Sequence, residues 1–163
     1  MDIDPKVFLD VPLNQNVPHA CSPPAPLSTW RGVVVRAPAR ILFKRGEKVG
    51  PNGAFAAIPI CGYFRVDVQL GSKEPMTLVA VARASGKVFS GPIVETDPGL
   101  MIPPPAAPPL TEEDVKGTAS GGYFNPNLVD FVPLPPGPGT YDVHVEFRQF
   151  KSNVVTIELV ETP

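Results

Sequence analysis

Two histidines, His19 and His144, are the only imidazoles with which this chain could carry out acid–base chemistry. Nucleophilic catalysis needs a Ser or Cys beside a His that an acidic group orients. His144 alternates with Asp142 and Glu146, so we expect it to be a solvent-facing strand residue. Ser120 is one position out of register with a Gly-x-Ser-x-Gly elbow and lacks its strand-to-helix setting. The sequence therefore predicts a protein that is not an enzyme.

The sequence also predicts neither a metal nor a cofactor. His19 and Cys21 are two ligand types close together, but no second Cys or His pair follows at the spacing of a zinc site. The acids of 112–114 are typical of the first turn of a helix, where they complement its dipole. Asp2 and Asp4 lack the acidic, glycine-containing loop of an EF-hand, and no phosphate-binding glycine loop occurs.

Cys21 and Cys61 allow one disulfide or two free thiols, and the sequence leaves both interpretations open. A bond would close a loop whose loss of chain entropy stabilises the fold by about 4 kcal/mol. The first residues lack the basic and apolar regions of a signal peptide, so we expect a cytoplasmic protein with two free thiols. The alternative is the mature domain of a secreted or periplasmic protein.

Composition points to one folded, soluble domain over residues 1–163. Hydrophobic residues make up 43% of the chain and charged residues 18%, so the 23 Pro and 14 Gly do not suffice to keep it unfolded. The formal net charge of -2 argues against nucleic acid as a partner. No apolar stretch is long enough to span a membrane.

The clearest structural pattern lies near the C-terminus. From Tyr141 to Phe147 apolar and polar residues alternate strictly, and the alternation resumes from Val155 to Leu159. This pattern predicts an antiparallel hairpin whose buried side chains are Tyr141, Val143, Val145, Phe147, Val155, Ile157 and Leu159. Residues 135–139, which are Pro and Gly only, predict a tight connection before it.

A second alternating pattern runs from Val33 to Arg45 and predicts a strand rather than a helix, because Pro38 and three consecutive valines disfavour a helix interior. Proline cannot donate to a ladder, so Pro38 marks an edge strand, a bulge, or a break into two strands at a corner.

Other segments complete the predicted element order. Strands are expected at 64–70, 77–82 and 87–90, one more short strand is expected from 123–124 and 128–132, and one capped helical turn is expected at 111–117. Residues 1–27 form a Pro-containing N-terminal arm. A Pro/Gly-rich insert spans 97–122, and its six prolines between 97 and 110 predict exposed polyproline II.

Seven to eight short strands without βαβ alternation predict an all-β fold, an antiparallel sandwich. The segment from Pro138 to Ile157, with Gly139-Thr140-Tyr141-Asp142-Val143 and a return through Ser152-Asn153, resembles the last two strands of immunoglobulin- and fibronectin-type sandwiches. The resemblance implies an Ig-like fold class and carries no functional residues. Cys21 and Cys61 do not flank Trp30 as the cysteines of true immunoglobulin domains flank their core tryptophan.

The favoured functional hypothesis is a protein-binding or assembly module whose partner is another protein or a second copy of the chain. The basic residues Arg36, Arg40 and Lys44 are either a partner contact or charges that protect an exposed edge strand. From the Pro-rich insert we add Ile102, Pro104 and Leu110 as contact residues. The alternatives are an inhibitor that presents this insert to a hydrolase, and a ligand-binding sandwich or enzyme.

Overall fold

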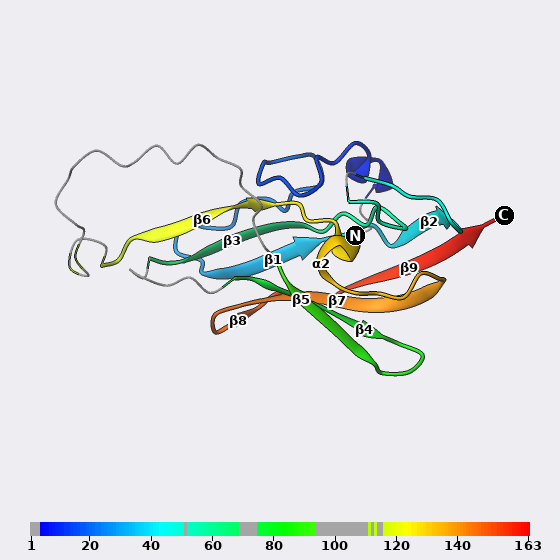
Figure 1. The fold of residues 1–163 in the computed structure, drawn as a ribbon. Coiled ribbons are helices and arrows are strands. Elements are labelled where there is room, and N and C mark those ends of the chain that lie inside the picture. Colours follow the sequence, from blue (N-terminus) through cyan, green and yellow to red (C-terminus); the bar gives the residue numbers. More distant parts are fainter. Residues whose placement is uncertain (1–3, 51, 69–74, 94–110, 112, 114–115) are drawn as a thin grey trace.

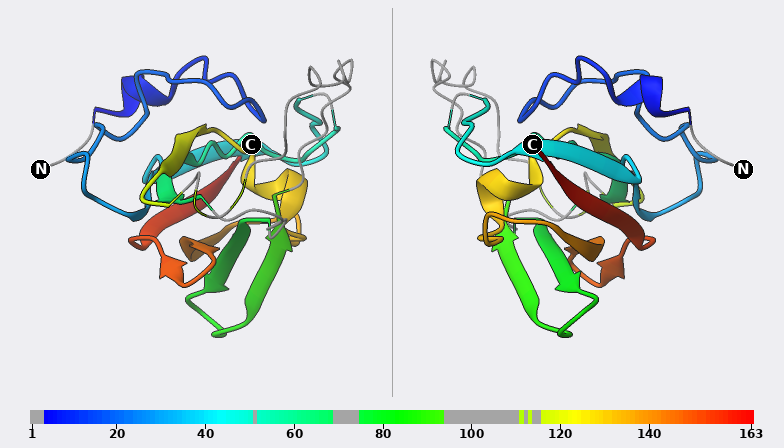
Figure 2. Two further views of the ribbon diagram at one scale, coloured as in Figure 1. Left: turned by 90° about the vertical axis from the view of Figure 1, so that its left-hand side faces the viewer. Right: turned by 90° about the vertical axis from the view of Figure 1, so that its right-hand side faces the viewer.

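The computed structural model describes residues 4–50, 52–68, 75–93, 111, 113 and 116–163, and it confirms an all-β fold of two sheets (Figure 1). One sheet has three strands in the order β1-β3-β6. The other has six, in the order β2-β9-β7-β4-β5, with β8 paired to β7. The two sheets lie one above the other, and the N-terminal arm crosses the three-stranded sheet on the side away from the β4–β5 hairpin (Figure 2).

The elements have the following bounds: η1 Pro5–Phe8, β1 Gly32–Arg36, β2 Arg40–Lys44, β3 Cys61–Asp67, β4 Thr77–Ala82, β5 Val88–Pro92, β6 Ala119–Phe124, α2 Leu128–Phe131, β7 Gly139–Phe147, β8 Phe150–Lys151 and β9 Val155–Thr162. Every strand pair is antiparallel except β2 with β9, which is parallel.

Pro38 marks a corner between the two sheets. The segment from Val33 to Arg45 is broken into β1 and β2, which belong to different sheets. The alternation nevertheless continues across the break, since Val33, Val35 and Phe43 are all buried. Of the three interpretations of Pro38, the structure therefore selects the break, and it also makes β2 an edge strand.

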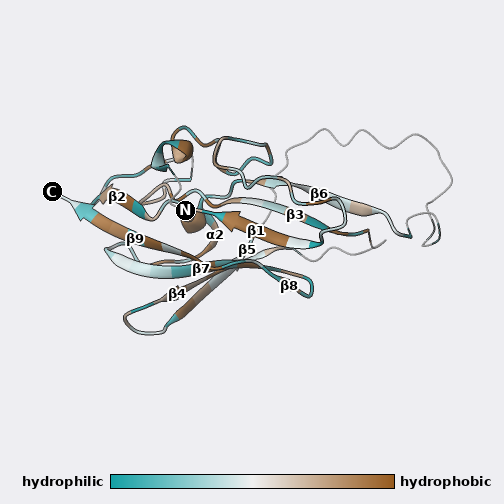
Figure 3. Ribbon diagram, turned by 180° about the vertical axis from the view of Figure 1, so that it is seen from behind, coloured by the Kyte–Doolittle hydropathy of each residue, from teal (hydrophilic) through white to brown (hydrophobic). Residues whose placement is uncertain are grey.

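The predicted inner face of the closing hairpin is confirmed. Tyr141, Val143, Val145 and Phe147 on β7 are buried, as are Ile157 and Leu159 on β9. Val155 is partly buried against the same core. The other sheet supplies Val35, Val66 and Phe124, and the rings of Phe64 and Phe147 meet edge to face at 5.6 Å. Figure 3 shows the hydrophobic stretches along β1 and β9.

The strand predicted at 128–132 is wrong, because this segment forms the helical turn α2. Leu128 of α2 and its C-cap residue Val132 are both buried and are four apart, so one helical turn brings both to the same side. Gly91 of β5 lies against this turn, and a Cβ at Gly91 would overlap the carbonyl oxygen of Phe131. The turn thus fills the space between the sheets beside β5.

The boundary of the Pro/Gly-rich insert also differs from the prediction. β6 begins at Ala119, inside the segment expected to span 97–122. Gly121 pairs with Arg65 of β3, and a Cβ there would lie 2.6 Å from the carbonyl oxygen of Phe64. Glycine is therefore required for this close pairing rather than for a loop. The predicted polyproline segment and residues 112, 114 and 115 of the turn at 111–117 lie outside the described residues.

Two valine substitutions, one in the core and one on the surface, test which side chains are buried. Val145→Ala should lower the free energy of unfolding by about 2 kcal/mol, because Val145 is fully buried and its methyl groups leave a cavity. Val154→Ala, at a side chain that is 53% exposed, should change it by less than about 0.5 kcal/mol. Urea unfolding measures both, and equal effects would contradict the assigned faces.

Candidate protein-interaction site at the edge of β2

The two histidines lie on separate parts of the fold. The backbone N–H of His19 donates to Ser22 Oγ in the N-terminal arm. His144 is 8% exposed, so the prediction of a solvent-facing side chain is wrong. It lies at the centre of a sheet, opposite Val79 of β4, and its Nε2 is 3.1 Å from Glu146 Oε1. No group of three or more metal-ligating side chains gathers among the residues that the structure describes.

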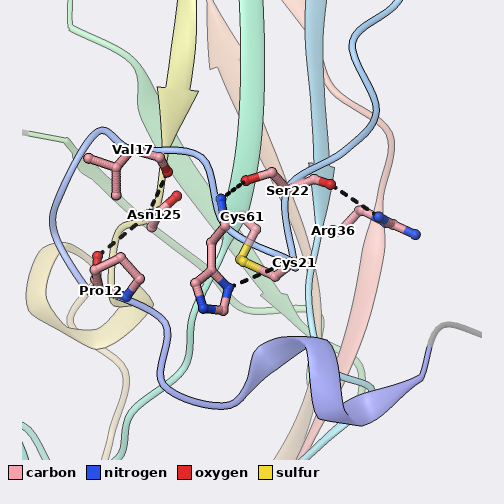
Figure 4. Close-up of a disulfide and its surroundings, with 8 residues drawn as sticks. Pro12, Val17, Cys21, Ser22, Arg36, Cys61 and Asn125 are labelled. Carbon is pink, nitrogen blue, oxygen red and sulfur yellow. Dashed lines mark hydrogen bonds between the residues drawn. A yellow bond between two sulfur atoms is a disulfide. The ribbon is translucent and has the colours of Figure 1, made fainter.

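Cys21 and Cys61 form a disulfide, which corrects the expectation of two free thiols (Figure 4). Their Cα atoms are 5.9 Å apart and both residues are fully buried. Sequence reasoning could not supply that separation, which depends on the arm folding back over β3. The bond joins the N-terminal arm to the first residue of β3.

Asparagines hold the rest of the arm in place. Asn14 N–H donates to the carbonyl oxygen of Asn125 at 2.7 Å, and Asn125 Nδ2 donates to Val17 O at 3.0 Å (Figure 4). Asn127 N–H donates to Asn14 Oδ1 at 2.9 Å. Asn125 and Asn127 are both buried, and their hydrogen bonds fix the loop of the arm over the end of β6. The N-terminal arm therefore has a fixed position on the sheet.

The structure separates the three basic residues singled out from the sequence. Arg36 ends β1, and its Nη1 donates to Ser22 O at 3.1 Å, so it helps to hold the arm. Arg40 and Lys44 lie on β2, in the other sheet. Arg40 is paired with Glu158 at 3.0 Å, while Lys44 is exposed and has no ion pair within the described residues. Ile102, Pro104 and Leu110, on which the inhibitor alternative rests, lie outside them.

The edge of β2 that faces away from β9 has unpaired peptide groups. Glu158 N–H donates to Ala39 O at 2.9 Å, so the odd-numbered residues along β2 direct their backbone N–H and C=O toward β9. In a strand, the N–H and C=O of one residue point to the same side, and those of the next residue point to the other side. The N–H and C=O of Arg40 and Leu42 therefore point outward. Within the described ranges no hydrogen bond reaches the N–H or C=O of Leu42. The side chain of Leu42 is also 62% exposed.

Two cavities line the inner side of this edge. One, of about 440 Å³, is bordered by Phe43, Val49 and Phe55 together with Ile41 and Ala57. The other, of about 370 Å³, lies between β2 and the N-terminal arm and is bordered by Phe8, Leu9 and Leu13. Arg40, Ile41 and Ala57 border both cavities, so the two lie side by side, and together they are hereafter called the β2 groove. A third cavity of about 630 Å³, over β9 and the start of β7, also reaches Arg40.

Most of the groove was missed from the sequence. Arg40 and Lys44 were chosen for their charge, and Leu42 between them was not, although it is an apolar residue on the polar face of the alternating pattern. That apolar residue on the polar face was the one signal in the sequence that could have pointed to this edge. Nothing in the sequence relates Phe8 or Ala57 to β2, because their proximity depends on the path of the arm and on the chain entering β3.

The other three sheet edges are covered only in part or not at all. The N–H and C=O of Val35 in β1 bond to Asn153 Oδ1 and Nδ2, each at 2.9 Å. The arm forms a bridge between Gln15 and Asn125 at the end of β6. β5 is also open, since no hydrogen bond of the described residues reaches the outward backbone groups of Val88 and Ser90, but it ends at Pro92, which cannot donate, and none of the three cavities borders it. Among the described strands, β2 combines an open edge with an apolar depression.

Charges on the outer face of the six-stranded sheet form a network away from the groove. Hydrogen bonds from Arg83 at 3.0 Å and from Thr156 at 2.8 Å hold the pKa of the Asp142 carboxyl below its usual range. On the inner face, burial raises the pKa of the Tyr141 hydroxyl. Neither group borders the groove.

Comparison of the chain with protein-family models, with curated proteins and with solved structures gives no match. None of the helices in the described ranges has the length and apolar content needed to cross a membrane.

Removal of the disulfide tests its structural role. The double variant Cys21→Ala with Cys61→Ala should lose about 4 kcal/mol of unfolding free energy, because the loop of 40 residues is no longer closed in the unfolded chain. Urea unfolding with and without a reductant measures this. The reductant should destabilise the native protein and leave the double variant unchanged. A native protein whose thiols react freely before reduction would contradict the bond.

Titration of Asp142 tests the outer network. Its folded pKa is lowered, so the stabilising contribution is present above the unfolded pKa and is lost as the pH falls through the folded value. Arg83→Leu should raise the pKa toward that of an ordinary aspartate, as followed by carboxyl NMR shifts. Arg31→Leu, which removes the ion pair with Asp67, should leave Asp142 unchanged. A similar shift in both variants would contradict the assigned cause.

Proposed function

We propose that this protein is a non-catalytic protein-binding or assembly module, and that it takes up an extended segment of its partner along the free edge of β2. The observation that carries the proposal is the outward-facing, unpaired peptide group of Leu42 beside the apolar β2 groove. Extended peptides add to sheet edges through main-chain hydrogen bonds, and pockets for alternate side chains select their sequence.

The cost of leaving this edge open supports the proposal. Exposed edges promote unwanted pairing, and proteins usually block them with charges, prolines or covering segments. Arg40 and Lys44 act in this way, but Leu42 between them is 62% exposed, and Leu9 on the arm is 63% exposed. Large apolar side chains gathered around the β2 groove are typical of an interaction surface.

We further propose an immunoglobulin- or fibronectin-type sandwich, working in an oxidising compartment. The antiparallel pairing of β7 with β9 supports the first part, since these strands carry the sequence resemblance. The buried disulfide supports the second, because such bonds persist in secreted and periplasmic proteins and are rare in the cytoplasm. The proposal therefore favours a secreted or periplasmic domain over the cytoplasmic one first expected.

Display of random extended peptides tests the groove as a binding site. Ala57 is exposed and borders both cavities, so Ala57→Trp should fill the groove without disturbing the core, and it should abolish capture of the selected peptides. Ala84→Trp is the matched control, since Ala84 is exposed in the turn between β4 and β5. Equal capture by the native protein and the Ala57→Trp variant would refute the groove as the site.

A further inference from the structure

We infer that the segment bound at the edge of β2 is an antiparallel strand of a different protein, with an apolar residue opposite Leu42 and an acidic residue opposite Lys44. This inference rests on the proposed function and adds to it the chemistry of the partner. It is carried by the order of cation, leucine and cation along the exposed face of β2.

The geometry of strand addition fixes which partner residue meets which side chain. Residues directly opposite each other in an antiparallel pair share one face of the sheet, and their side chains contact. Partner residues opposite Arg40, Leu42 and Lys44 therefore lie on the outer face. The residues between them point inward, beside Ile41 and Phe43, toward the two cavities of about 370 and 440 Å³. Apolar side chains fit those positions.

The charges around β2 leave Lys44 without a local partner. Arg40 is paired with Glu158, and Arg45 with Glu161 at 2.7 Å. Glu47 and Lys44 both border the cavity of about 440 Å³, but they make no ion pair with each other in the described part of the chain. Lys48 adds a second cation nearby, whereas Asp10 borders the opposite end of the groove. An acidic residue on the partner strand supplies the missing counter-charge.

A second copy of this chain does not fit the same edge. Outward peptide groups pair only between even-numbered residues of two β2 strands. When Leu42 meets its own copy, Arg40 lies opposite Lys44 at both ends, and like charges directly opposite are destabilising. A shift of the register places Lys44 opposite Pro38 or Arg40 opposite Gly46. Proline cannot donate to the new ladder, which disfavours the first of these registers, and in the second Gly46 lies beyond the end of β2 with φ 80°, so it is not extended and cannot continue the pairing.

The test uses the full chain and two synthetic peptides, TEVLVET and TKVLVKT. Amide exchange followed by NMR reports the site directly. In the free protein the Leu42 amide should exchange rapidly, while those of Ile41 and Phe43, which face β9, exchange slowly. Saturating TEVLVET should slow exchange at Leu42 by at least about tenfold, because strand addition gives its N–H a partner.

Charge reversal tests the preference for acids. TEVLVET should bind the native protein at least about fivefold more tightly than TKVLVKT, since one exposed cross-strand charge pair contributes up to about 1 kcal/mol. Lys44→Glu should reduce or invert this preference. Lys87→Glu, on the distant β4–β5 hairpin, is the matched control and should preserve it. The preference should shrink as the salt concentration rises.

The outcomes separate this inference from the proposed function. Equal affinity for both peptides, with Leu42 protected, would overturn the acidic preference and leave the groove as a binding site. Rapid exchange at Leu42 with either peptide, together with display clones that depend on the groove, would overturn the addition of a strand to β2 and leave the groove as a binding site of another kind. A dimer seen by light scattering and lost in Ala57→Trp would instead identify a second copy as the occupant.

Discussion

The arrangement of this fold depends on how each sheet edge satisfies its backbone N–H and C=O groups, because an unpaired group away from water is costly. Asn153 provides a side-chain amide that bonds both backbone groups of Val35, so one residue satisfies the edge of β1 at this position. The arm bonds to Asn125 at the end of β6. At Pro38 the chain leaves the three-stranded sheet, and β2 then forms an edge of the six-stranded sheet. There the outward N–H and C=O of Leu42 have no partner among the described residues.

The disulfide contributes to the candidate site indirectly. It fixes residue 21 to the start of β3, and bonds from Asn125 and Asn127 hold the preceding loop. One wall of the β2 groove is therefore supplied by a segment with little regular structure apart from η1. A wall that is ordered before binding loses less entropy when a partner arrives, and such preorganisation raises affinity.

The charge distribution agrees with a surface that binds protein rather than a polyanion. Although six of the seven charges between Arg31 and Lys48 are basic, Arg31 is paired with Asp67, Arg40 with Glu158 and Arg45 with Glu161. The local excess of positive charge seen in the sequence is thus largely neutralised by residues distant in the chain. Lys44 and Leu42 remain as the features that a partner can address, through one charge and one apolar contact.

The sequence by itself determined the closing hairpin, its buried face and the all-β class, because a period of two requires no knowledge of distant residues. It predicted the wrong state for 128–132, where residues four apart are buried in one turn, and for His144, which neighbouring strands cover. The disulfide and the β2 groove were decided only by the tertiary structure. Both join segments tens of residues apart, and their proximity follows from the path of the arm and the corner at Pro38, which no local pattern encodes.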